Sequence, residues 1–173
     1  MNKTLYAFDL DDTLVLSSSN VIVRNTATNK VTKLTPAEFA IYDEKPGDRF
    51  DFVEFDNLND PKIIKKNFDL FSKILMKTST SPDSKTIILT ARSPKIKSDV
   101  YQLLKSQGLP SLTIHAVGDS NPQAKVNIIQ QYIDKGYERV RFWDDSPKNV
   151  MAVNQMKKQN PGVDINAKLI VAH

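Results

Sequence analysis

A short apolar run that ends in a cluster of acids constrains this chain more than any other stretch. The run extends from Leu5 to Phe8, and Asp9, Asp11 and Asp12 follow it directly. Apolar runs of this length are typical of buried strands. Side chains two residues apart point to the same side of an extended chain, so Asp9 and Asp11 are expected to lie together. Two close carboxylates do not both ionise freely, which predicts a bound cation or a shared proton. The alternative is a strand that ends in an ordinary polar turn with solvated acids.

Apolar runs and helical patterns then alternate along the chain. Beyond the first strand, strands are predicted at 86–90, 112–117, 139–143 and 168–172. Helices are predicted from Pro61 to about Lys77, with Asp60 as N-cap, and at 94–107, 122–135 and 147–159. This alternation is typical of a parallel sheet with helices on both faces. The predicted fold is therefore α/β, a Rossmann-like parallel five-stranded sheet in which functional groups gather at the carboxyl ends of the strands.

The segment at about 16–58 differs from its neighbours and is predicted to be a small insertion after strand one. Two β-type runs, Val21–Val23 and Val31–Leu34, flank a stretch rich in Asn and Thr, which predicts a hairpin. Thr35, Pro36 and Glu38 form the pattern of a helix start, for a short helix through about Tyr42.

Aromatic residues at 50, 52 and 55 end this insertion and predict a strand or an extended segment that packs in a core, rather than a platform for stacking bases. The whole chain, 1–173, is predicted to be a single domain. Because the insertion leaves and returns beside the acidic strand end, it is expected to be a lid over the mouth of the site; the alternative is that it only covers an edge of the core.

Composition removes several kinds of chemistry. The chain of 173 residues has no cysteine and two histidines, which excludes disulfides, thiolate nucleophiles and cysteine-ligated zinc and disfavours a histidine metal cluster. No apolar run approaches the roughly 18 residues of a membrane span. The N-terminus enters the first predicted strand without a signal-peptide pattern, so a cytoplasmic protein without a membrane partner is expected. The net charge of +4 would help to attract a phosphorylated substrate, although solubility explains it equally well.

Four segments in order resemble the motifs of the haloacid-dehalogenase (HAD) superfamily of phosphohydrolases. Asp9-Leu10-Asp11-Asp12-Thr13 is similar to the family pattern Asp-x-Asp-x-Thr, and Thr90 ends the second predicted strand as motif two does. Lys125 would be the lysine of motif three, and the segment from Asp144 to Asn149 matches Asp-Asp-x-x-x-Asn. The resemblance covers nearly the whole chain except the insertion. Asp12 is a departure, because many members carry Gly there.

The resemblance implies roles for the acids. Asp9 would be the nucleophile that forms an aspartyl-phosphate, and Asp11 would protonate the leaving oxygen and later deprotonate the attacking water. Mg²⁺ would be held by Asp9, Asp144 and the backbone carbonyl of Asp11, because a hard cation prefers oxygen ligands. Asp145 and Asn149 would support the metal shell through waters. Asp145 and Asn149 also suit a plain helix start beside Pro147, and both interpretations can hold together.

Three further residues would contact the phosphate. The resemblance implies that Thr90 hydrogen-bonds a phosphate oxygen and that Lys125 counters the charge on Asp9 and on the phosphoryl group. Arg92 is a candidate for phosphate contact as well. Each has a structural alternative: Thr90 could cap a helix, Lys125 could be a solvated surface charge, and Arg92 could pair with an acid.

These features predict a Mg²⁺-dependent phosphatase that hydrolyses a phosphate monoester through an aspartyl-phosphate. In the family that the chain resembles, members with small caps have more open sites and often accept large substrates, which together with the basic charge favours a nucleotide or a polynucleotide end as substrate. The alternatives are a non-catalytic module that binds phosphate or nucleic acid on the same fold, and a phosphotransferase. A dehalogenase is disfavoured, because that reaction needs neither Asp11 nor the metal.

Overall fold

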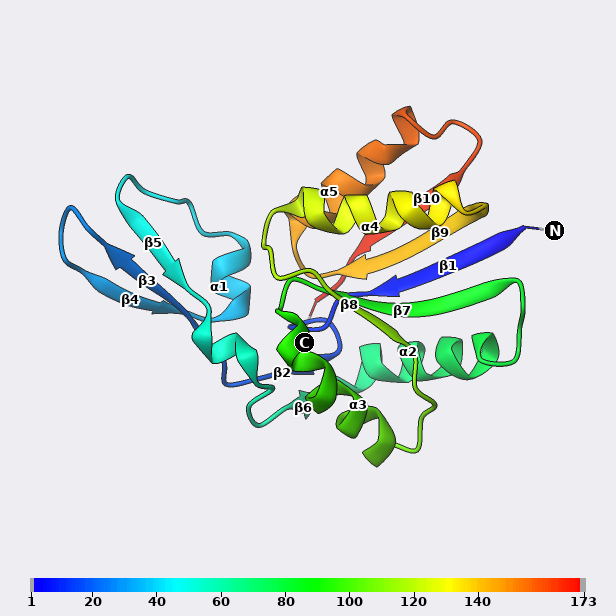
Figure 1. The fold of residues 1–173 in the computed structure, drawn as a ribbon, viewed down its shortest axis with the longest axis horizontal. Helices are drawn as coiled ribbons and strands as arrows, with labels where there is room; N and C mark the ends of the chain where they lie inside the picture. The colour runs from blue at the N-terminus through cyan, green and yellow to red at the C-terminus, as the bar shows by residue number, and fades with distance from the viewer. Residues whose placement is uncertain (1, 172–173) are drawn as a thin grey trace.

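A five-stranded parallel sheet forms the centre of the chain in the computed structural model, which describes residues 2–171 (Figure 1). Its strands are β1 (Lys3–Phe8), β7 (Ser84–Thr90), β8 (Thr113–Ala116), β9 (Tyr137–Asp144) and β10 (Asp164–Leu169). They are arranged in the order β10-β9-β1-β7-β8, and every neighbouring pair is parallel. The predicted α/β fold with a Rossmann-like sheet is confirmed at this level.

Helices cover both faces of the sheet because side chains alternate along the strands. On β1, Phe8 belongs to a core under α2 and α3, whereas Leu5 and Ala7 belong to a second core under α4 and α5. Figure 1 shows these two pairs of helices on opposite sides of the sheet. The helical segments of the core are α2 (Lys65–Thr78), η2 (Pro94–Ile96), α3 (Lys97–Ser106), α4 (Pro122–Asp134), α5 (Pro147–Gln155) and η3 (Met156–Lys158).

The strand order creates a switch point beside β1. The chain passes from β1 to β7 and β8 on one side, then crosses to β9 and β10 on the other. Loops that follow β1 and β9 therefore diverge to opposite faces, which leaves a crevice at the carboxyl ends of these two strands. The strand ends that carry Asp9 and Asp144 meet at this crevice.

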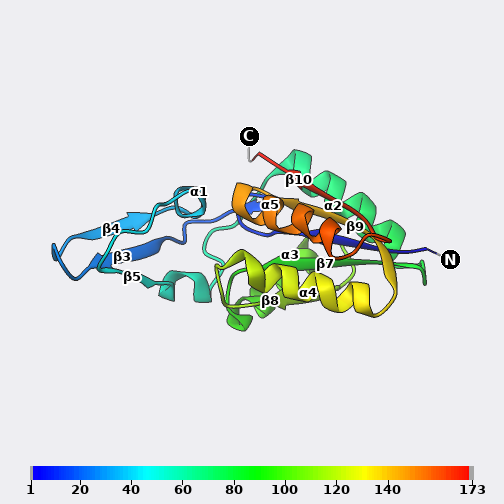
Figure 2. The ribbon, with the colours of Figure 1, turned by 90° about the horizontal axis from the view of Figure 1, so that it is seen from above.

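The insertion folds around a small sheet of its own that extends from the carboxyl-end side of the main sheet (Figures 1 and 2). Val21, Val23, Leu34 and Phe55 form its core. A short ribbon made by β2 and β6 lies where the insertion joins the main sheet. The elements of this part are β2 (Val15–Leu16), β3 (Val21–Asn25), β4 (Val31–Leu34), α1 (Pro36–Ala40), β5 (Asp48–Asp51), η1 (Val53–Asp56) and β6 (Lys62–Ile63).

The structure confirms the hairpin and the helix start that were predicted in the insertion. The hairpin is formed by β3 and β4, with Val21 opposite Leu34. Thr35 accepts a hydrogen bond from the Glu38 amide while the Glu38 side chain accepts one from the Thr35 amide, which is the predicted capping box. The helix ends at Ala40, two residues before the predicted end.

Three boundaries predicted from the sequence are wrong. Asp60 is not a helix cap; it has a positive φ of 43°, and the chain forms β6 before α2 begins at Lys65. The segment with Phe50 is strand only to Asp51 and then turns into η1. The terminal strand spans Asp164–Leu169 rather than 168–172, because burial of Ile165 and Ala167 against the helical layer fixes its register; residue 172 lies outside the described residues.

No helix between residues 2 and 171 combines the length and the apolar character that a bilayer crossing requires.

Candidate active site

Three carboxylates meet at the switch point of the sheet. Asp9 follows β1, Asp144 is the last residue of β9, and Asp145 comes next in the chain. One oxygen of each carboxylate lies within 4.8 Å of the others, a spacing that suits a single metal ion. Asp9 is 6% exposed and Asp144 is fully buried, so their negative charges require compensation inside the protein.

Lys125 supplies part of that compensation. It lies one turn into α4, which begins with Asn121 as N-cap, and is 2% exposed. Its Nζ donates to Asp9 Oδ1 and Asp144 Oδ2, each at 2.8 Å. Burial alone would lower the pKa of Lys125, but the carboxylates of Asp144 and Asp9 outweigh burial and raise this pKa above its ordinary value. The solvated-surface alternative for Lys125 is therefore wrong.

Hydrogen bonds from the same two strand ends orient the carboxylates. Thr13 Oγ1 donates to Asp9 Oδ2 at 3.0 Å. The backbone amide of Ser146 donates to Asp144 Oδ1 at 2.9 Å, and Asn149 Nδ2 donates to Asp144 Oδ2 at 3.0 Å. The sequence interpretation gave no role to Thr13 or Ser146. Both positions could have been noticed in the sequence. Thr13 is the last residue of motif one, and Ser146 precedes Pro147 in the pattern of a helix N-cap, which it forms for α5.

The charges of this cluster fit a divalent cation. Burial raises the pKa of Asp9, and Asp144 raises it further; burial and then Asp9 do the same to the pKa of Asp145. One lysine faces three carboxylates, so without a metal the group retains protons, which a divalent cation would displace. An all-oxygen set of this kind suits Mg²⁺. The carboxylate of Asp145 lies in this group, whereas the sequence interpretation placed Asp145 in the outer shell and used the Asp11 carbonyl as a ligand.

Thermal unfolding at two pH values tests this charge balance. Because the folded protein holds protons on Asp9 and Asp145 above their ordinary pKa of 3.8, the unfolded chain binds fewer protons there. The stability of the metal-free protein should therefore fall as pH rises from 5 to 8, and Mg²⁺ should raise Tm more at pH 8. At pH 8, a Mg²⁺ concentration 100 times the Kd at that pH should raise Tm by about 5–10 °C, and the same concentration should raise it less at pH 5.

Two variants serve as references for this measurement. Asp145→Asn should reduce the fall in stability between pH 5 and pH 8, because it removes one of the raised carboxyls. Asp69→Asn alters an exposed acid on α2 and should change neither the fall nor the response to Mg²⁺. Equal Mg²⁺ shifts at both pH values in the unaltered protein would contradict the charge balance.

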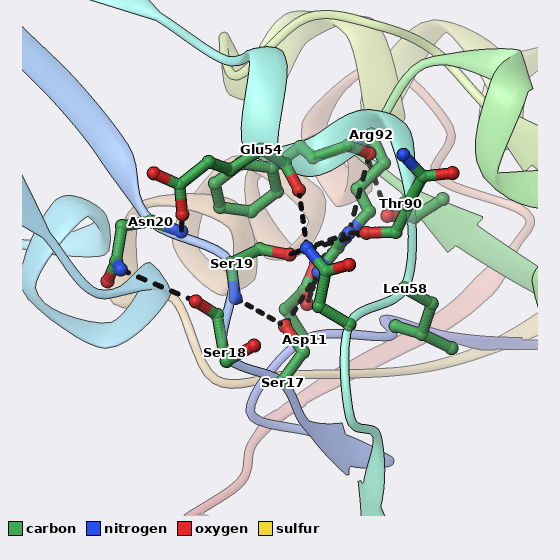
Figure 3. Close-up of polar contacts among 12 residues, drawn as sticks. Asp11, Ser17, Ser18, Ser19, Asn20, Glu54, Leu58, Thr90 and Arg92 are labelled. Carbon is green, nitrogen blue, oxygen red and sulfur yellow. Dashed lines mark hydrogen bonds and ion pairs between the residues drawn. The ribbon is translucent and has the colours of Figure 1, made fainter.

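Asp11 does not belong to the three-carboxylate group and pairs instead with Arg92, as Figure 3 shows. Arg92 Nε donates to Asp11 Oδ2 at 2.8 Å and Nη2 donates to Oδ1 at 2.7 Å, which is a two-bond ion pair. The Arg92 side chain is 1% exposed and that of Asp11 14%. The structure thus shows the structural pairing that the sequence left open for Arg92.

Arg92 also holds both segments that connect the insertion to the main sheet. On the outgoing segment, Nη2 donates to Ser17 Oγ at 2.8 Å. On the returning segment, Nη1 donates to the Asn57 carbonyl at 2.9 Å, and the guanidinium lies 4.5 Å from the ring centroid of Phe55. Figure 3 shows these segments converging on the one guanidinium. We call the set of Asp11, Ser17, Asn57 and Arg92 the Arg92 junction.

Thr90 ends β7 and is 1% exposed. Its Oγ1 accepts a hydrogen bond from the Arg92 amide at 3.2 Å, and Thr90 is not among the residues that line the cavity described below. Ser93, rather than Thr90, is the N-cap of the following η2. Contact between Thr90 and a phosphate stays a prediction.

Asp12 has the backbone conformation that explains why glycine suits its position. Its φ is 58°, in the left-handed region that residues with a Cβ seldom adopt and that Asp tolerates better than most. Asp12 is 8% exposed and its Oδ2 is buried without a hydrogen-bond partner among the described residues. Burial, with help from Asp11, raises the pKa of Asp12 to about 6.

A cavity of about 500 Å³ opens between the main sheet and the insertion. Asp9, Asp144 and Lys125 line it from the main sheet and its helices, and aromatic residues of the insertion line it as well. The prediction that Phe50, Phe52 and Phe55 are core residues holds for Phe55 and in part for Phe50, but Phe52 is 41% exposed.

Searches of protein-family models, curated proteins and solved structures found no match to this chain.

Proposed function

We propose that this chain is a Mg²⁺-dependent phosphatase of the HAD type, which hydrolyses a phosphate monoester through an aspartyl-phosphate on Asp9. The observation that carries the proposal is the buried Lys125, which bridges Asp9 and Asp144 inside a group of three carboxylates at the switch point. Two of the three donors of Lys125 Nζ bind these acids, and the third would bind and stabilise the transferring phosphoryl group.

Two displacements at phosphorus make up the proposed reaction. A carboxylate oxygen of Asp9 attacks phosphorus, the bond between phosphorus and the ester oxygen breaks, and the leaving oxygen takes a proton from Asp11. Water then attacks the phosphorus of the aspartyl-phosphate and gives a proton to Asp11, which restores the Asp9 carboxylate and releases inorganic phosphate. Mg²⁺, held by Asp9 and Asp144, would neutralise the carboxylates and the phosphate oxygens.

The remaining residues would position these groups. Thr13 and Lys125 each donate to a different oxygen of Asp9, so the orientation of the attacking carboxylate is fixed before the substrate arrives. Arg92 binds both oxygens of Asp11, so one of these bonds must be released before Asp11 can carry a proton. Arg92 is therefore proposed as a positioning residue for the acid and base, rather than as a phosphate ligand.

Removal of the metal tests the function. The purified protein should release phosphate from small monoesters in the presence of Mg²⁺, lose this activity after chelation and dialysis, and regain it when Mg²⁺ is restored. Lys125→Met should lower kcat/KM by about 10²–10³, the usual cost of removing one group that stabilises the transition state. Lys65→Met, which changes an exposed lysine on α2 that does not line the cavity, is the matched control and should leave kcat/KM within about twofold. Undiminished turnover after complete chelation would contradict the proposal.

A further inference from the structure

An aromatic wall lines the insertion side of the cavity. The wall consists of four phenylalanines that line the same cavity as Asp9: Phe39, Phe50, Phe52 and Phe55. They belong to α1, β5 and η1 or lie directly beside these elements. Phe39 is edge-on to Phe50 and Phe52, with ring centroids 5.4 and 5.5 Å apart, and Phe52 meets Phe55 at 6.2 Å. These rings therefore form one continuous surface.

Phe52 is the member of this wall that lacks cover. It is 41% exposed, whereas Phe55 on the same strip of chain is 9% exposed and packs in the core of the insertion. An aromatic ring that stays open to a cavity offers a surface for stacking or edge contacts with a second ring. The wall and the carboxylates line the same cavity, so one bound molecule can touch both.

The charge of the cavity limits which molecules can bind in it. Eight of the lining residues are Asp or Glu, and three are Lys or Arg. Two of these cations, Arg92 and Lys125, are already committed to buried ion pairs. Asp43 and Glu44 of the insertion add negative charge near the wall. Even with one divalent cation bound, the lining stays negative, and a second phosphate would be repelled.

The volume of about 500 Å³ suits a small molecule rather than a polymer. Binding cavities for small ligands are typically about 300–1,000 Å³ and combine an apolar wall with a few polar groups. The positive net charge of the whole chain therefore says little about the substrate, because the charge of the cavity has the opposite sign.

We infer that the site takes a phosphate monoester with one phosphate and one planar ring: the phosphate lies at the carboxylates and the ring lies against Phe52. A nucleoside monophosphate and a small benzyl-type phosphate share this chemistry. The inference rests on the proposed function and narrows it, because it disfavours the polynucleotide ends that the sequence suggested.

Paired substrates test the ring and the charge separately. With Mg²⁺ present, kcat/KM for benzyl phosphate should exceed that for butyl phosphate by about tenfold, because contact with a ring is the main difference between them. The ratio of kcat/KM for adenosine 5′-monophosphate to that for ribose 5-phosphate makes the same test with a nucleoside. Comparison of the two ratios shows whether the site prefers a nucleoside monophosphate or a benzyl-type phosphate. Adenosine 3′,5′-bisphosphate and a 5′-phosphorylated trinucleotide should each fall at least about tenfold below the monophosphate.

A variant pair assigns the preference to the wall. Phe52→Ala should lower the ratio of benzyl to butyl phosphate kcat/KM by about three- to tenfold. Val53→Ala is the matched control, because Val53 is the next residue, is 57% exposed and does not line the cavity. It should leave the ratio unchanged. An unchanged ratio in Phe52→Ala, or equal rates for benzyl and butyl phosphate in the unaltered protein, overturns the ring contact. A trinucleotide that reacts as fast as the monophosphate overturns the charge argument.

Binding to Asp9→Asn separates this inference from the proposed function. Calorimetry with Mg²⁺ gives Kd for benzyl and butyl phosphate without turnover. If no monoester is hydrolysed by the unaltered protein, the phosphatase proposal fails, while a Kd about tenfold lower for benzyl phosphate still supports the ring site. If monoesters are hydrolysed but the two Kd values are equal, the function stands and the ring site is refuted.

Discussion

Replacement of Asp9 by Asn is expected to lower kcat for any monoester by about 10⁴ or more, a loss typical of removing a nucleophile. The amide cannot attack phosphorus, yet it has nearly the shape of the carboxylate and its oxygen can still accept a hydrogen bond from Lys125 or Thr13. The fold should survive. Steady-state phosphate release at saturating Mg²⁺ measures the loss, and thermal unfolding shows whether the variant is folded.

Asp69→Asn provides the reference for this experiment. It makes the same chemical change at an exposed acid on α2 that pairs with Lys65, and kcat should stay within about twofold, since such surface pairs contribute little. An Asp9→Asn protein that is folded and retains a rate near that of Asp69→Asn would show that Asp9 is not the nucleophile.

Replacement of Arg92 by Ala is expected to destabilise the protein by about 3–5 kcal/mol, because it leaves a largely buried carboxylate without its partner. The Asp11 side chain is 14% exposed, and the Asn57 carbonyl and the Ser17 hydroxyl lose a donor as well. For a chain of this size, Tm should fall by about 6–20 °C. Thermal unfolding in the absence of Mg²⁺ measures the loss without a contribution from metal binding.

Two further variants distinguish the junction from an ordinary ion pair. Arg141→Ala removes an arginine that pairs with Asp164, whose side chain is 59% exposed, and should cost no more than about 1 kcal/mol. Arg92→Lys keeps the positive charge but cannot donate through two nitrogens to one carboxylate, so its Tm should lie between those of Arg92→Ala and the unaltered protein. A loss in Arg92→Ala no larger than that in Arg141→Ala would rule out the junction as a main support of the fold.

The parts of the molecule that were predictable from sequence are those with local signals. The main strands and the starts of α4 and α5 are set by apolar runs, Pro and capping residues within a few positions of one another. Asp9 and Asp144 could be placed together because parallel strands bring their carboxyl ends to one edge of the sheet. The terminal strand was misplaced because its register depends on how Ile165 and Ala167 pack against the rest of the fold.

The parts that were not predictable depend on partners far along the chain. The two-residue β6 exists because it pairs with β2, and no local preference reveals such a pairing. The sequence offers several acids as partners for Arg92, and only the folded structure shows that the partner is Asp11. Alternation of aromatic residues could not show that Phe52 faces a cavity, because the chain leaves the strand at Asp51 and turns.

The insertion has its own hydrophobic core, separate from the two cores of the main sheet, and this separation bears on how such a protein can evolve. Substitutions at Val21, Val23 or Leu34 change packing inside the insertion and leave the strands that carry Asp9 and Asp144 untouched. Selection can therefore remodel the insertion side of the cavity while Asp9 and Asp144 keep their positions. Such changes are constrained at one place, because Arg92 must still find hydrogen-bond acceptors on both segments that connect the insertion to the main sheet.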